Sequence, residues 1–167
     1  MQLDLQRDFK EIYAHLADRV RNFKPDSNDG PGVPGPVKLI EAGFNYSQGG
    51  WLAVVFDTRP NAEPDGEWNS HIDGNAFERP HWQEAGEANI DEPITVVHWD
   101  GKKKELPART ELAELLGELI KAVLLKARAD GVFAKLPKAP GCELGVEHQE
   151  GHYGWPAYED RGKENIA

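Results

Sequence analysis

Cysteine is nearly absent from this sequence: Cys142 is the only one in 167 residues. One thiol can form neither an intramolecular disulfide nor a four-thiolate zinc site, and a chain of this length needs neither to fold. We therefore expect a reducing, cytoplasmic location, which a charged N-terminus without an apolar leader also favours. Because Glu143 follows the cysteine, and a neighbouring carboxylate raises a thiol pKa, we expect no reactive thiolate.

Long apolar runs are missing as well. The longest runs from Trp51 to Phe56, whereas a membrane-spanning helix needs roughly 20 residues. The sequence also lacks a Gly-x-Ser-x-Gly elbow, a His-Glu-x-x-His motif, a Cys-x-x-Cys motif, a Walker motif and a dinucleotide fingerprint. These absences lead us to expect no membrane partner and no cofactor, and they favour a protein that is not an enzyme.

Negative charge is the strongest feature that is present. The formal net charge is −10, and residues 57–92 contain 10 acidic and 2 basic residues, a net charge of −8 for that stretch. Such a field repels nucleic acid and attracts a basic protein surface. The simpler interpretation is a solvated face that keeps the protein in solution.

Two segments have the periodicity of amphipathic helices. Residues 4–24 place apolar side chains at helical spacing, with Asp4 as the N-cap and Pro25 beyond the end. Residues 110–130 do the same, with acidic residues in the first half and basic residues in the second, an order that complements the helix dipole. Gly131 is a suitable residue to end that helix.

Strands and loops are predicted from alternation, apolar runs and turn residues. The predicted strands are 37–46, 50–57, 66–73, 94–99 and 142–148. Residues 47–49 and Asp100-Gly101 are predicted turns, and residues 26–36 a surface loop. The segment Pro80-His81-Trp82 is predicted to lead into a polar loop.

These elements predict a single domain over residues 1–167 of the α+β class. We expect an antiparallel-rich sheet of about five strands, with an N-terminal and a C-terminal amphipathic helix packed on one face. Residues 57–92 form an acidic, loop-rich insertion in this scheme, and residues 156–167 a loose tail. The sequence does not indicate the oligomeric state.

Tryptophans among carboxylates make the acidic stretch a candidate protein interface, since aromatic anchors ringed by polar residues are typical of interfaces. The predicted contact residues are Asp57, Arg59, Asp65, Glu67, Trp68, Asp73 and Trp82. In the alternative interpretation both tryptophans cover the edge of the core, and Asp57 pairs with Arg59 to fix a turn.

Histidines suggest two enzymatic alternatives. In the first, His71, Asp73 and His81 converge on a metal ion in a hydrolase. In the second, a carboxylate and a histidine near the C-terminus act as general acid and base. That cluster consists of Glu147, His148, Glu150, His152, Tyr153 and Trp155. A third possibility is a structural or regulatory domain with an unidentified ligand.

Three segments carry a resemblance to known proteins: FDTRPNAEPDGEW at 56–68, PHW at 80–82 and GVEHQEGHYGWP at 145–156. In these segments and in its order of elements, the chain resembles small bacterial domains, many of which are suspected immunity proteins of contact-dependent or polymorphic toxin systems. The resemblance implies an acidic, cytoplasmic, non-enzymatic protein that caps a toxin. Together with the charge pattern, it predicts a domain that neutralises a basic protein partner through an acidic, tryptophan-containing surface.

Overall fold

The computed structural model describes residues 1–24, 35–59, 76–88, 91–106 and 109–156. Within these ranges three α-helices pack with a five-stranded and a three-stranded sheet, so the predicted α+β class is confirmed. None of the described helices is both long and apolar enough to cross a membrane. The predicted strand over 66–73 lies outside the described residues, as do residues 26–34 of the predicted loop and residues 157–167 of the predicted tail.

The five-stranded sheet has the order β4-β3-β2-β7-β8. Its strands are β2 (Val37–Asn45), β3 (Trp51–Asp57), β4 (Phe77–Glu78), β7 (Lys138–His148) and β8 (Gly154–Pro156). β2 and β3 form the predicted antiparallel hairpin, whereas β2 and β7 run parallel, with Ala42 opposite Val146. The other pairs are antiparallel. The antiparallel-rich sheet of about five strands is therefore confirmed.

A smaller sheet joins β1 (Gln2–Asp4), β5 (Thr95–Val97) and β6 (Lys103–Glu105) in the order β1-β5-β6. The predicted turn at Asp100-Gly101 closes the β5–β6 hairpin, with Gly101 at φ +86°. Hydrogen bonds from the backbone and side chain of Lys102 lower the pKa of Asp100 to about 2. β1 and β6 are not predictable from their own apolar content, because each is held by pairing with β5.

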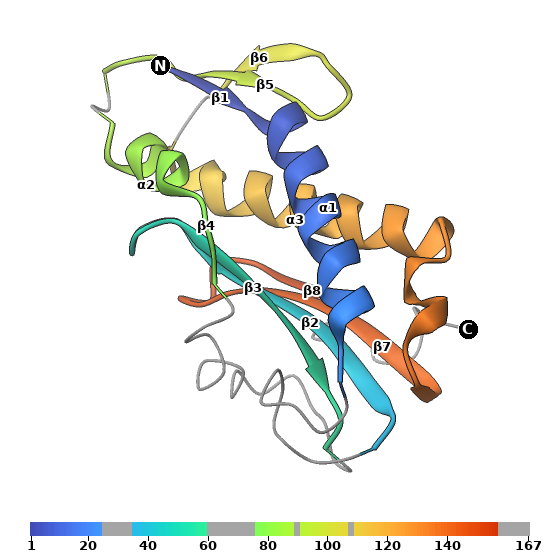
Figure 1. The fold of residues 1–167 in the computed structure, drawn as a ribbon. Helices are drawn as coiled ribbons and strands as arrows, with labels where there is room; N and C mark the ends of the chain where they lie inside the picture. Colours follow the sequence, from blue (N-terminus) through green and yellow to red (C-terminus); the bar gives the residue numbers. More distant parts are fainter. Residues whose placement is uncertain (25–34, 60–75, 89–90, 107–108, 157–167) are drawn as a thin grey trace.

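The two predicted amphipathic helices are α1 (Leu5–Asn22) and α3 (Leu112–Ala129), and both lie on the same face of the large sheet (Figure 1). Asp4 caps α1 as predicted, since Oδ1 accepts a hydrogen bond from the Arg7 backbone at 3.0 Å. A short 3-10 helix, η2 (Arg109–Glu111), precedes α3, and another, η3 (Val132–Lys135), follows Gly131 at φ +74°. The apolar stripes of both helices form the core with the large sheet.

A third helix, α2 (Pro80–Glu87), replaces the predicted polar loop, so that prediction was wrong. Proline fits the first turn of a helix because its φ is already helical and the missing N–H would have no partner there. Trp82 and Ala85 then fall on one face, and both are fully buried. Just before α2, the backbone of Arg79 lies close to Gly50. A Cβ added to residue 50 would lie 2.0 Å from the Arg79 carbonyl oxygen.

Candidate functional site

Four of the seven predicted contact residues, Asp65, Glu67, Trp68 and Asp73, lie outside the described residues. Asp57 and Arg59 lie at the end of β3, where Asp57 is buried. The carboxylate of Asp57 accepts hydrogen bonds from the Arg59 backbone at 2.9 Å and from its guanidinium at 3.0 and 2.6 Å. This is the local pair of the alternative interpretation, so Asp57 does not offer an open carboxylate to a partner.

Trp82 is fully buried, which corrects its prediction as a surface anchor. The reason is the unpredicted helix α2, which turns the indole into the core. There its ring meets the ring of Phe44 edge to face at 6.5 Å, and its indole N–H donates to Asp8 Oδ2 at 2.8 Å. Trp82 therefore stabilises the fold rather than contacting a partner.

Asp8, on α1, is a buried carboxylate surrounded by donors from the segment around α2. His81 Nε2 lies 2.9 Å from both carboxylate oxygens, and Arg79 reaches Oδ1 at 3.3 Å. Arg79 also pairs with Glu11, and its guanidinium stacks over the Phe77 ring at 4.0 Å. Burial by itself would raise the pKa of Asp8, but hydrogen bonds from His81 and Trp82 and the nearby positive charges lower it below the usual value. Asp8 is thus an ionised group that ties α1 to α2.

The same geometry bears on the metal alternative. Because Asp8 engages Nε2 of His81, only Nδ1 would be open to a metal, and metal-bound histidines commonly carry a carboxylate on the other nitrogen. The two other predicted ligands, His71 and Asp73, lie outside the described residues. Within the described ranges, no three His, Cys, Asp or Glu side chains are grouped so that they could hold a metal ion.

The predicted C-terminal acid–base cluster is divided between two environments. His148 is fully buried in β7, between the rings of Phe44 and Tyr46. Its Nδ1 accepts from the Glu150 backbone at 3.2 Å, and its Nε2 has no hydrogen-bond partner within the described ranges. Burial is the main cause of a lowered pKa of His148, and the neighbouring imidazole of His152 lowers it further. Among the residues that the structure describes, no carboxylate is hydrogen-bonded to the His148 ring, so the predicted acid–base pair is not formed there.

Tyr153 and Trp155, by contrast, lie against α3 and help to form a groove. Two adjoining hollows lie along the exposed face of this helix, one of about 340 Å³ beside the β5–β6 hairpin and one of about 450 Å³ beside β8. Both are lined by Glu114 and Glu118. We call this surface the α3 groove. Its first hollow is completed by His98, Trp99, Lys104, Leu106, Glu111 and Leu115, and its second by Lys121, Gly151, His152, Tyr153, Gly154 and Trp155.

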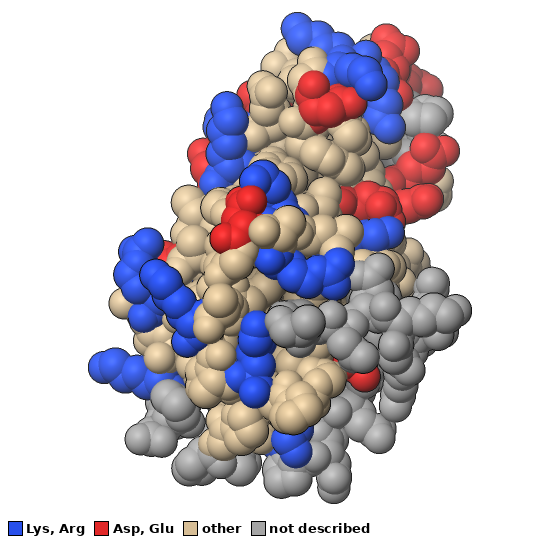
Figure 2. All heavy atoms as spheres, turned by 90° about the vertical axis from the view of Figure 1, so that its right-hand side faces the viewer, with Lys and Arg blue, Asp and Glu red and all other residues tan. Residues whose placement is uncertain are grey.

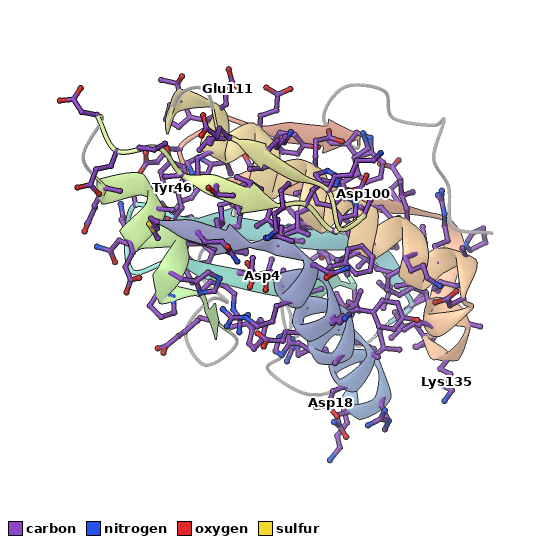
Figure 3. The ribbon with its side chains drawn as sticks, turned by 90° about the horizontal axis from the view of Figure 1, so that it is seen from above. Asp4, Asp18, Tyr46, Asp100, Glu111 and Lys135 are labelled. Carbon is purple, nitrogen blue, oxygen red and sulfur yellow. The ribbon has the colours of Figure 1, made fainter. Side chains whose placement is uncertain are left out.

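The floor of the α3 groove is a row of carboxylates. Glu111 is the last residue of η2, and Glu114 and Glu118 follow it on α3 at intervals of three and four residues, so the three lie along one side of this helical segment. Figure 3 shows Glu111 at the edge of the molecule, at the start of α3. Neither Glu111 nor Glu114 forms an ion pair within the part of the chain that the structure describes.

Aromatic rings form the two walls. On one side, Trp99 stacks with His98 at a ring separation of 3.6 Å. On the other, the Tyr153 ring packs directly on α3 at Gly117, where an added Cβ would lie 2.4 Å from the ring. The Tyr153 hydroxyl donates to Glu118 at 2.7 Å. A concave surface with a carboxylate floor and aromatic walls is suited to cationic groups.

Sequence reasoning missed the α3 groove, although it had noted parts of it. The sequence alone indicates a complement to the helix dipole for the three glutamates, and membership of an acid–base cluster for Tyr153 and Trp155. Carboxylates repeated at helical spacing opposite the apolar stripe were the available signal. The aromatic walls come from segments whose position beside α3 depends on long-range strand pairing.

Comparison with protein-family models, with curated proteins and with solved structures finds no match for this chain. The fold and the α3 groove therefore supply the functional evidence.

Proposed function

We propose that this chain is a non-enzymatic protein-binding domain whose partner is a basic protein. The observation that carries the proposal is the α3 groove, in which Glu111, Glu114 and Glu118 lie between aromatic walls. Cationic side chains are attracted to such a site by charge and by the faces of the rings. The particular form suggested by the resemblance of the sequence is an immunity-type protein that neutralises a toxin.

The charge distribution supports this function. With a net charge of −10, the chain attracts a basic partner over a distance and so speeds association. On the face shown in Figure 2, most acidic side chains lie in the upper part, beside a group of Lys and Arg side chains, and further Lys and Arg side chains lie over the lower part. Asp65, Glu67, Trp68 and Asp73 remain proposed contacts of the acidic stretch.

A capture experiment with matched variants tests the proposal. The tagged chain is incubated at low salt with lysate of the source organism, and proteins eluted by rising salt are identified by mass spectrometry. The unmodified chain should retain a basic protein in stoichiometric amount, and the double variant Glu114→Gln/Glu118→Gln should not retain it. The control Glu84→Gln/Glu87→Gln on α2, within the acidic stretch, removes the same charge from exposed residues and should keep it.

Three results are informative. If only the Glu114→Gln/Glu118→Gln variant loses the basic protein, the proposal is supported and the α3 groove is the binding site. If only the Glu84→Gln/Glu87→Gln control loses it, the function is supported but the binding site lies in the acidic stretch. If no basic protein is retained by the unmodified chain, the proposal is contradicted.

The paired geometry of Asp8 and His81 favours one second candidate, a metal-assisted hydrolase in which Nδ1 of His81 binds the metal together with His71 and Asp73. Metal analysis of protein purified without an affinity tag decides this question. Stoichiometric zinc, manganese or iron that is lost in His81→Ala would support the hydrolase. A substoichiometric content of all three metals would contradict it.

A further inference from the structure

The second hollow of the α3 groove already holds a cation that belongs to the chain itself. Lys121 Nζ lies 3.3 Å from Glu118 Oε1 and 5.1 Å from the centre of the Trp155 ring. Only 27% of its side chain is exposed. A carboxylate and a ring face acting together on one ammonium group are the contacts that a foreign lysine or arginine would need here.

The first hollow offers similar chemistry without an internal cation in that position. Glu111 and Glu114 are exposed beside the Trp99 ring, and neither is paired within the described ranges. Lys104 also lines this hollow but forms no ion pair with them. A cationic side chain could therefore enter the first hollow directly, whereas in the second it must displace Lys121.

The distance between the carboxylates along α3 determines how far apart two basic side chains of a ligand should be. An α-helix rises about 1.5 Å per residue, so Glu114 and Glu118 are about 6 Å apart along the axis, and Glu111 and Glu118 about 10 Å. An extended peptide rises about 3.3 Å per residue. Two basic side chains separated by two or three positions in an extended segment therefore match the two hollows, whereas adjacent basic residues fall short.

We propose that the α3 groove binds an extended segment of the partner with two basic side chains at positions i and i+2 or i and i+3, one in each hollow, and that Lys121 competes for the second. This inference rests on the proposed function and specifies the recognition element. In the bound state the incoming cation takes over the contacts of Lys121 with Glu118 and Trp155. Competition from Lys121 therefore lowers the affinity of the α3 groove for this segment.

Synthetic peptides test the inference directly. Four capped, glycine-based peptides each carry two arginines, at spacings i+1, i+2, i+3 and i+6, and their dissociation constants are measured by calorimetry at low salt. The i+2 and i+3 peptides should bind about two- to fivefold more tightly than the others, the size of one exposed cation–π contact. Lys121→Met should tighten these two by a similar factor, and Glu114→Gln/Glu118→Gln should abolish the preference for spacing.

The outcomes separate this inference from the function. Equal affinity for all four peptides, or weaker binding by Lys121→Met in a folded protein, overturns the two-hollow inference, while capture of a basic partner would still support the function. Absence of peptide binding together with successful capture also overturns it. Failure of the capture experiment contradicts the proposed function itself. Glu84→Gln/Glu87→Gln serves as the charge-matched control and should bind the peptides with an unchanged preference.

Discussion

His81 Nε2 lies 2.9 Å from both oxygens of Asp8, a residue 73 positions earlier in the chain. With the indole of Trp82 and the guanidinium of Arg79 on the same carboxylate, this contact fixes α2 against α1. Three donors on one buried carboxylate make Asp8 a polar group on which the packing of both helices depends.

Replacing Asp8 with alanine should lower the free energy of unfolding by about 3–5 kcal/mol, because it leaves the buried indole N–H of Trp82 without an acceptor and removes one of the two carboxylates that pair with the largely buried Arg79. Urea denaturation followed by circular dichroism measures the change. The control is Asp18→Ala on the same helix, whose exposed carboxylate pairs with the exposed Arg21 and whose loss should change stability by about 0.5 kcal/mol or less. Similar values for the two variants would contradict the structural role of Asp8.

Gly117→Ala should destabilise the protein by about 1–3 kcal/mol, because the new methyl group overlaps the Tyr153 ring. The same change should have the opposite sign in a Tyr153→Ala background. With the ring absent, alanine gains roughly 1 kcal/mol of helix propensity over glycine. Urea denaturation of the four proteins of this cycle gives both values. If Gly117→Ala has the same effect in both backgrounds, Tyr153 does not pack on α3 as described.

Stability should fall as the pH is lowered below about 6.5, because His15 and His148 are held neutral in the folded protein. Burial is the main cause of the lowered pKa of both, aided by Arg19 for His15 and by His152 for His148. The pKa values of both histidines in the folded protein lie below the ordinary 6.5. Between pH 6.5 and those lower values the unfolded chain therefore binds more protons than the folded protein does. This loss of stability is complete once the pH is below the pKa values of the two histidines in the folded protein.

Urea denaturation at pH 7.5 and at pH 5.5 measures this effect. His15→Phe keeps an aromatic ring against Phe77, with which His15 stacks at 4.4 Å, and should reduce the pH dependence. Asp8 adds a further loss only in more acidic solution, below the ordinary aspartate pKa of 3.8, because there the unfolded chain binds a proton that the folded protein, with its lowered Asp8 pKa, does not. Equal stability of the unmodified protein at the two pH values would argue against neutral, buried histidines.

Cys142 should not react with iodoacetamide in the native protein near neutral pH. The thiol is fully buried, and burial raises its pKa to about 11, so the reactive thiolate is scarce. Mass spectrometry of native and urea-unfolded samples gives the two alkylation rates. The unfolded chain should react readily, and a native rate equal to it would contradict the burial of this side chain.

The sequence predicted those elements whose apolar side chains repeat with a clear period. In α1, Leu5, Ile12, Leu16 and Val20 are buried as the spacing required, and β3 is apolar because both its faces are covered. α2 was missed because its helical face is made by only two buried residues, Trp82 and Ala85. The partner of Trp82, Asp8, lies 74 positions away, beyond any local pattern.

The site was less predictable than the fold for a related reason. The α3 groove combines the β5–β6 hairpin, one face of α3 and the segment around β8. Pairing of Trp155 with Val146 and of Thr95 with Gln2 places its two walls, and such registers are not visible in local sequence. The concentration of charge in residues 57–92, in contrast, was visible in the sequence but does not by itself specify which carboxylates form a concave surface.

The parallel pairing of β2 with β7 has a consequence for how the protein is made. About 90 residues separate the end of β2 from the start of its second neighbour, β7, so β2 leaves the ribosome well before β7 does. During that interval an apolar strand edge has no native partner, and open edges of this kind promote aggregation of nascent chains. The main sheet can therefore be completed only after these intervening residues have been synthesised, and until then the edge of β2 is open to pairing with other chains.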